Sequence, residues 1–226
     1  MTIRAVVFDL DDTLYPERDY VYSGYGTIAR HLRDSFGRRE DFQGWLWNRF
    51  LAGEYKRAFN DVSDHFRLGL SDKQIGDLVS LYCEHSPEIR PGEGIVDLLR
   101  QLRGRFRLGI LSDGRLPAQQ LKLDALQIAQ FFDAVVFTES LGPESQKPSP
   151  AGFEAIAAKL DAPHAACAYV GDNPSKDFVA PNTLGWRTIQ YRFDGQIHSH
   201  KLAPRGGQPQ IVATSTQEIL AAVMEG

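Results

Sequence analysis

From residue 95 to the end of the chain, short apolar runs alternate with segments of helical periodicity. Apolar runs typical of buried strands occur at residues 5–8, 107–111, 134–137, 167–170, 186–189 and 210–213. Predicted helices lie at residues 95–102, 117–128, 150–160, 177–184 and 216–224, the last capped by Ser215. Strands that alternate with helices are joined by right-handed crossovers and form a parallel sheet with helices on both faces. We therefore predict an α/β fold with a doubly wound parallel sheet.

The stretch between the first two predicted strands has a different composition. It is rich in aromatic and charged residues at helical spacing. Phe42, Leu46 and Phe50 form one apolar stripe of this kind. Proline and glycine at residues 91–94 then end the helical pattern. We therefore predict an all-helical domain at residues 16–90. It is inserted into a core made of residues 1–15 and 91–226.

Size and composition are those of an ordinary soluble protein. A length of 226 residues corresponds to about one and a half typical domains, which suits a core with one insertion. The net charge of −4 argues against a nucleic-acid partner, because nucleic-acid binding needs a basic face. The two cysteines, Cys83 and Cys167, share no short-spacing motif, which excludes a disulfide framework or a zinc finger.

Signals for export or membrane insertion are not visible in the sequence. Residues 1–4 lead directly into a strand-like run, and no apolar stretch approaches the length of a membrane span. We expect a cytoplasmic protein without a membrane partner. Nothing in the pattern indicates a particular oligomeric state.

In a parallel sheet of this kind, ligands bind beyond the carboxyl ends of the strands, and three acids follow the first strand. Asp9, Asp11 and Asp12 lie within four positions, so their charges repel one another unless a cation joins them. One interpretation is a solvated acidic turn in which Asp12 caps a neighbouring segment. The other is a magnesium site, in which a carboxylate can also act as a nucleophile.

Polar residues also follow the next two strands. Ser112-Asp113-Gly114 can present a hydroxyl and backbone N–H groups to a phosphoryl oxygen, although a serine before a turn is common. Lys147 is followed by proline and lies just before a predicted helix, where a cation is well placed to bind phosphate or carboxylate. An exposed surface lysine is the alternative.

The fourth strand ends in a glycine followed by two acids. Gly171 permits a sharp turn, and Asp172 and Asp177 are far enough apart to play different roles. One can bind a metal while the other holds a metal-bound water or Lys147. Each segment alone has an ordinary explanation, but four in this order at four strand ends indicate one shared site.

Together these four segments resemble the haloacid dehalogenase-like (HAD) superfamily, most of whose members are phosphatases. The family's Asp-x-Asp-x-Thr motif matches residues 9–13, and its hydroxyl and lysine motifs fall on Ser112 and Lys147. Its Gly-Asp-x-x-x-x-Asp motif matches residues 171–177. The resemblance covers about residues 3–189. It implies a Rossmann-like core in which the helical insertion is a C1-type cap.

Two positions depart from the common family pattern. Asp12 stands where many members have glycine, although an acid is also common there. Asp113 stands where asparagine is frequent. It leaves the hydroxyl motif intact but adds a negative charge near the expected phosphate.

The resemblance implies a two-step phosphoryl transfer. Asp9 is the nucleophile that becomes a phosphoaspartate, and Asp11 is the general acid and base. Mg²⁺ is the implied cofactor, bound by the Asp9 carboxylate, the Asp11 backbone carbonyl and Asp172. Asp177 orients the waters on the metal or Lys147.

The remaining motif residues are implied to bind the substrate's phosphate. They are Ser112, Asp113, Gly114 and Lys147. Because the acids of the site repel a phosphate dianion, both the metal and Lys147 are needed to offset them. The implied substrate is a small phosphomonoester, such as a nucleoside monophosphate or a sugar phosphate.

Several other functions fit parts of the pattern. Dehalogenases of this superfamily lack an acid two residues after the nucleophile, so Asp11 argues against them. Phosphonoacetaldehyde-type hydrolysis needs a Schiff-base lysine in the cap, for which Lys56 is the candidate. A sugar phosphomutase shares every core residue and is the main alternative. A phospho-receiver module would be shorter and lack the insertion, and a catalytically silent binding protein would not need the full residue set.

One further pair of residues stands outside these motifs. His198 and His200 form a His-x-His sequence in a segment rich in glycine and proline. We expect both to face solvent rather than to bind a metal.

Overall fold

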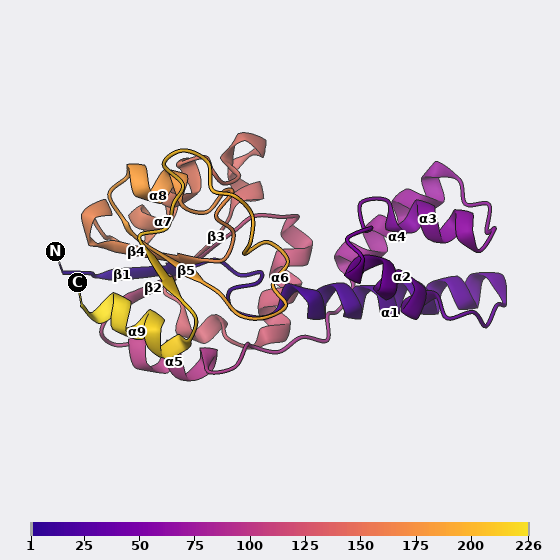
Figure 1. The fold of residues 1–226 in the computed structure, drawn as a ribbon, viewed down its shortest axis with the longest axis horizontal. Helices are drawn as coiled ribbons and strands as arrows, with labels where there is room; N and C mark the ends of the chain where they lie inside the picture. Colours follow the sequence, from indigo (N-terminus) through magenta and orange to yellow (C-terminus); the bar gives the residue numbers. More distant parts are fainter. Residues whose placement is uncertain (1, 226) are drawn as a thin grey trace. The chain divides into compact units, whose positions relative to one another are not determined.

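The computed structural model describes residues 2–225 and contains a six-stranded, fully parallel sheet (Figure 1). The strands are β1 (Ala5–Phe8), β2 (Arg107–Ser112), β3 (Ala134–Phe137), β4 (Cys167–Gly171), β5 (Arg187–Tyr191) and β6 (Ile211–Ala213). Their order across the sheet is β3-β2-β1-β4-β5-β6, the doubly wound arrangement. The predicted α/β class is confirmed.

Helices connect and follow the strands. The α-helices are α1 (Glu17–Phe36), α2 (Phe42–Leu51), α3 (Ala58–His65), α4 (Asp72–Glu84), α5 (Ile95–Leu102), α6 (Leu116–Leu126), α7 (Ala151–Lys159), α8 (Val179–Thr183) and α9 (Thr216–Met224). Four 3₁₀ turns are η1 (Ala129–Phe131), η2 (Thr138–Leu141), η3 (Pro143–Ser145) and η4 (His164–Ala166). Within residues 2–225, no helix combines the length and the apolar character that crossing a membrane requires.

The chain divides into two compact units. One consists of Met1–Arg18 with Arg90–Gly226 and contains the sheet, and the other is Asp19–Ile89. In the described chain, the second unit contains helices and no strand. Its core is built from apolar residues that recur at helical spacing on α1 to α4: Ile28, Leu32, Phe42, Leu46, Val62 and Leu78.

Apolar side chains from the strands and from helices on each face hold the sheet unit together. On one face, Phe153 and Ile156 of α7 and Phe178 just before α8 pack against Val7 of β1 and Tyr169 of β4. On the other face, α5 and α9 pack against each other (Figure 1). Burial of residues on both faces explains why the central strands are continuously apolar.

The structure confirms the one predicted helix cap and shortens one predicted helix. The hydroxyl of Ser215 accepts a hydrogen bond from the Glu218 backbone N–H at 3.2 Å, as predicted for the start of α9. The predicted helix at 177–184 is shorter, because α8 begins only at Val179. Asp177 instead closes a turn, in which its backbone N–H donates to the Asn173 carbonyl at 3.0 Å.

The two cysteines differ in burial, which predicts different reactivity. Cys167 of β4 is fully buried while Cys83 is half-buried. Burial raises the pKa of the Cys167 thiol from 9.0 to about 11, so its thiolate at pH 8 is about a hundred-fold scarcer than that of an unperturbed thiol. We expect DTNB to label Cys83 in the native protein and Cys167 only after denaturation. A native Cys83→Ser variant that still reacts rapidly would contradict this.

Candidate active site

The site lies where the strand order reverses, between the adjacent carboxyl ends of β1 and β4. Asp9 follows β1 and Asp172 follows β4, and the Asp9 backbone N–H donates to the Val170 carbonyl at 2.9 Å. In doubly wound sheets this reversal is where ligands bind. The first and fourth motifs predicted from the sequence therefore meet at this point.

Three buried carboxylates converge there. Asp9, Asp172 and Asp177 each have a carboxylate oxygen within 4.8 Å of the others. Among residues 2–225, the buried Oδ2 of Asp172 has no hydrogen-bond partner. Burial raises the pKa of Asp9 to about 6, and burial together with Asp177 and Asp9 raises the pKa of Asp172 well above its usual range.

This donor set fits a hard divalent cation. Carboxylate oxygens are the ligands that Mg²⁺ prefers, and the unpaired Asp172 oxygen is available to such an ion. Burial first, and then the neighbouring carboxylates, disfavour the ionised forms of Asp9 and Asp172 and raise their pKa values. A bound cation would remove that penalty.

Lys147 lies within this cluster. Its side chain is fully buried, and its Nζ lies 2.6 Å from Asp9 Oδ1, 2.9 Å from Asp177 Oδ1 and 2.9 Å from the Tyr169 hydroxyl. Although burial acts to lower it, Asp177 and Asp9 raise the pKa of Lys147 well above its ordinary value. Lys147 thus pairs with two of the three carboxylates, so one lysine offsets only part of the negative charge of the cluster.

Asp11 lies beside this cluster, but its side chain has other partners. The Tyr15 hydroxyl and Lys122 Nζ donate to Asp11 Oδ1, the lysine at 2.7 Å, and Gln119 Nε2 donates to Oδ2 at 2.8 Å. Although burial acts to raise it, Lys122 and these hydrogen bonds lower the pKa of Asp11. These contacts therefore favour the ionised form of Asp11 and fix the position of its carboxylate.

Gln119 of α6 binds the hydroxyl motif at the end of β2. Ser112 Oγ accepts a hydrogen bond from Gln119 Nε2 at 2.6 Å. Gly114 has a φ of +123°, and a Cβ at this position would lie 3.1 Å from the Gln119 side chain. Glycine therefore relieves both backbone strain and crowding here.

Asp113 has its carboxylate turned toward donors of the protein. Thr138 Oγ1 and the Lys147 backbone N–H donate to Oδ1 at 2.9 and 3.1 Å, and Lys176 Nζ donates to Oδ2 at 3.0 Å. Although burial acts to raise it, Lys147 and Lys176 lower the pKa of Asp113. This side chain anchors the backbone of Lys147. Its charge, which the sequence predicted to lie near the phosphate, is paired with Lys176.

Asp12 is a structural acceptor at the start of α1. Its φ of +52° lies in the left-handed region, where glycine is strain-free and aspartate is tolerated. Its carboxylate accepts from the backbone N–H groups of Glu17 at 2.8 Å and Ile197 at 2.6 Å. These hydrogen bonds fit the interpretation in which Asp12 caps a neighbouring segment.

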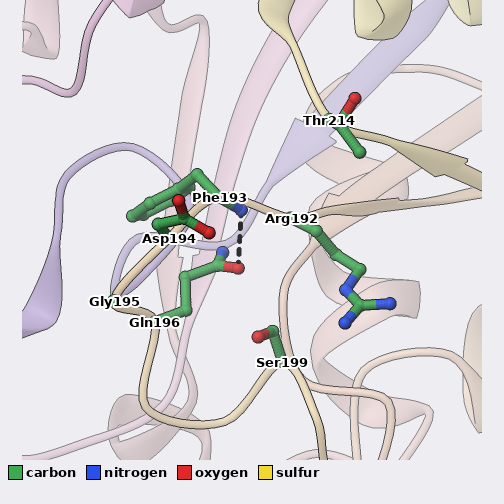
Figure 2. Close-up of a pocket in the computed structure, with 7 residues that line it drawn as sticks. All are labelled: Arg192, Phe193, Asp194, Gly195, Gln196, Ser199 and Thr214. Carbon is green, nitrogen blue, oxygen red and sulfur yellow. Dashed lines mark hydrogen bonds between the residues drawn. The ribbon is translucent and has the colours of Figure 1, made fainter.

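The segment that connects β5 to β6 contacts the loop that follows β1. Gln196 Nε2 donates to the Asp12 carbonyl at 2.6 Å. Figure 2 shows the hydrogen bond that Gln196 Oε1 accepts from the Phe193 backbone N–H, at 2.9 Å. Phe193 and Gln196 line a surface cavity of about 540 Å³ together with Arg192 and Thr214. The long β5–β6 connection thus buttresses the loop that carries Asp9 and Asp11.

The expectation for the His-x-His pair was half wrong. His200 is exposed, but His198 is half-buried, with Nε2 3.8 Å from the Glu17 carboxylate. Burial, together with Lys201, lowers the pKa of His198 to about 4, so its imidazole is neutral. The anchoring of Ile197 on Asp12 draws the neighbouring His198 inward.

Sequence reasoning missed several polar residues that contact the motif residues: Tyr15, Gln119, Lys122, Tyr169 and Lys176. A signal was present for two of them. Gln119 and Lys122 lie on the same helical face as Leu123 and Leu126, the face that α6 buries. A glutamine and a lysine on an apolar stripe indicate a buried polar contact.

Acids and a buried lysine at the strand reversal of a doubly wound sheet define an α/β protein with a small-ligand site. A family model for haloacid dehalogenase-like hydrolases matches residues 3–182. The chain belongs to this family, as the sequence motifs predicted.

Similar proteins agree with this assignment. The chain is 30% identical to glyceraldehyde 3-phosphate phosphatase of Methanopyrus kandleri over 84% of each chain. It is 23% identical to pyrophosphatase PpaX of Bacillus mycoides over 84% of this chain and 83% of that relative. The solved structure of the HAD-hydrolase YfnB from Bacillus subtilis bound to magnesium shares the fold, with a TM-score of 0.69 and 18% identity over 99% of each chain.

Proposed function

We propose that the protein is a Mg²⁺-dependent phosphomonoester hydrolase that acts through a phosphoaspartate on Asp9. The observation that carries this proposal is the buried cluster of Asp9, Asp172 and Asp177 around Lys147, with an unpaired carboxylate oxygen on Asp172. Two relatives named as phosphatases, at 30% and 27% identity, support the same reaction class.

In the first half of the reaction, an Asp9 carboxylate oxygen attacks phosphorus and the bond to the leaving oxygen breaks. Asp11 gives a proton to that oxygen. In the second half, water attacks the phosphoaspartate, Asp11 takes a proton from the water, and the Asp9 carboxylate is released. Lys147, Ser112 and the backbone of Asp113 and Gly114 bind the phosphoryl oxygens.

The cation would be held by the carboxylates of Asp9 and Asp172 and by the backbone carbonyl of Asp11, with Asp177 supporting it. When bound, it supplies positive charge against the phosphoryl group and the nucleophile. Lys147 holds the Asp9 carboxylate through its Nζ at 2.6 Å.

We propose a small phosphorylated metabolite as substrate, either a sugar phosphate or a nucleoside monophosphate. A relative named for glyceraldehyde 3-phosphate at 30% identity supports the sugar phosphate class. The assignment of residues 16–90 as a C1-type cap that selects the substrate belongs to this proposal.

Phosphate release from a panel of phosphorylated metabolites and aryl phosphates tests the function. We expect release with Mg²⁺ and none with EDTA. Isomerisation of a hexose 1-phosphate without phosphate release would identify the phosphomutase instead. Absence of both reactions across the panel would contradict the proposal.

Thermal unfolding tests the metal site without relying on turnover. Because the ion binds the folded state, Mg²⁺ at 100 times its Kd adds about 2.7 kcal/mol to the free energy of unfolding. We expect the unfolding midpoint to rise with Mg²⁺, and most of the rise to disappear in Asp172→Asn. Asp97→Asn is a matched control because the Asp97 side chain is 73% exposed. Equal shifts in both variants would argue against this site.

A further inference from the structure

The buried face of α6 carries two polar side chains beside the active site. Gln119 is 1% exposed and Lys122 is 5% exposed. They are three residues apart and therefore lie on one face of the helix. Both contact the carboxylate of Asp11, and none of the four motifs includes them.

The two α6 residues bind different oxygens of Asp11. Lys122 Nζ lies 2.7 Å from Oδ1 and Gln119 Nε2 lies 2.8 Å from Oδ2. A donor on a single oxygen leaves the carboxylate free to rotate about that contact, whereas donors on both oxygens fix its plane. Tyr15 adds a third hydrogen bond, to Oδ1.

Gln119 also contacts the hydroxyl motif. Its Nε2 lies 2.6 Å from Ser112 Oγ and 2.7 Å from the Asp113 carbonyl. One amide group therefore joins the proposed proton-transfer group to the proposed phosphate-binding loop. This helix therefore helps to set the distance between Asp11 and a phosphoryl group bound at Ser112.

Lys122 places a charged group on the buried, largely apolar face of α6. A leucine at this position would continue the apolar stripe of Leu123 and Leu126. Burying an ammonium group is costly unless it is paired. Its pairing with Asp11 at 2.7 Å offsets that cost and ties the side chain to the proposed proton-transfer group.

We propose that Lys122 and Gln119 are positioning residues that hold the Asp11 carboxylate in line with the leaving oxygen. This inference rests on the proposed function. As the Asp9 oxygen–phosphorus bond forms and the bond to the leaving oxygen breaks, the proton of Asp11 moves to that oxygen. Correct placement of Asp11 matters most when the leaving oxygen is strongly basic.

Two aryl phosphates whose leaving groups differ in basicity separate positioning from general structural support. Phenyl phosphate releases a basic phenolate that needs a proton, whereas 2,4-dinitrophenyl phosphate releases a weakly basic anion that does not. The ratio kcat/KM reports the steps up to leaving-group departure. We expect Lys122→Met and Gln119→Leu to lower kcat/KM for phenyl phosphate about 10- to 100-fold. This loss is smaller than the full contribution of a general acid, because Asp11 itself remains. For the dinitrophenyl ester we expect less than about a 3-fold loss.

Three further variants make the result specific. Asp11→Asn should show the same leaving-group dependence, more strongly. Lys122→Arg, which keeps a cation and donors, should recover most of the phenyl phosphate activity. Lys159→Met removes an exposed lysine at the end of α7 and should leave both values unchanged.

The outcomes separate this inference from the proposed function. Wild-type protein that releases phosphate from neither ester with Mg²⁺ would contradict the proposed function itself. A second outcome concerns an active wild type whose Asp11→Asn variant shows the leaving-group dependence. In that case, equal losses of kcat/KM on both esters in Lys122→Met and Gln119→Leu would overturn the positioning role alone. If Lys122→Met fails to fold, Gln119→Leu and Lys122→Arg decide by the same comparison.

Discussion

Replacement of Asp9 by asparagine is expected to lower phosphatase activity by on the order of 10⁴-fold or more, as loss of a covalent nucleophile does. The amide keeps the size of the side chain but is a poor nucleophile, and it removes one charge from the metal site. The measurement is phosphate release under saturating Mg²⁺, with Asp97→Asn as the control for a surface acid.

Stability should not account for this loss. Burial raises the pKa of Asp9 from 3.8 to about 6, which means that folding destabilises its ionised form relative to the unfolded chain. Removing that charge leaves Asp177 to pair with Lys147 at 2.9 Å. We therefore expect Asp9→Asn to unfold at or above the wild-type temperature in EDTA. Robust activity that survives in this variant would refute the mechanism.

Replacement of Lys147 by methionine is expected to have the largest effect on folding. Loss of one partner from a buried ion pair costs about 3–5 kcal/mol, and here the lysine faces both Asp9 and Asp177. Activity should also be lost, because Lys147 is proposed to bind the phosphoryl group. Urea denaturation and phosphate release measure the two effects, and Lys159→Met is the matched control.

The pH dependence of that loss has a definite sign. A carboxyl whose pKa is raised on folding binds more protons in the folded state, so stability falls as pH rises through its folded pKa. For Asp9 in the wild-type protein, the pH range over which stability falls runs from 3.8 to about 6. Without Lys147 this range extends to higher pH. We expect Lys147→Met to be more destabilising at pH 8 than at pH 5, and Mg²⁺ to restore part of the difference. An equal loss at both pH values would contradict the charge argument.

The fold and the meeting of the motifs were predictable because both depend on local patterns. Apolar runs such as Ala5–Phe8 identify buried strands, and the rule that ligands bind at their carboxyl ends placed Asp9 beside Asp172. Lys147 was predicted to bind phosphate or carboxylate. The structure gives it two carboxylate partners.

Contacts between distant segments were not predictable in this way. The hydrogen bond from the Ile197 backbone to Asp12 joins residues 185 positions apart, and no local pattern encodes it. It also explains why His198 is drawn inward although its surrounding sequence resembles an exposed loop. Gln119 and Lys122 were missed because a helix is recognised by its apolar residues, and polar residues on the buried stripe weaken that signal.

The central claim is that phosphate passes through a covalent bond to Asp9. Rapid acid quench of wild-type protein during turnover of an aryl phosphate with Mg²⁺, followed by mass spectrometry of its peptides, tests this most directly. We predict a peptide containing Asp9 that is heavier by one phosphoryl group and absent from Asp9→Asn. Turnover with no covalent phosphate on that peptide, or with phosphate on another residue, would contradict the account.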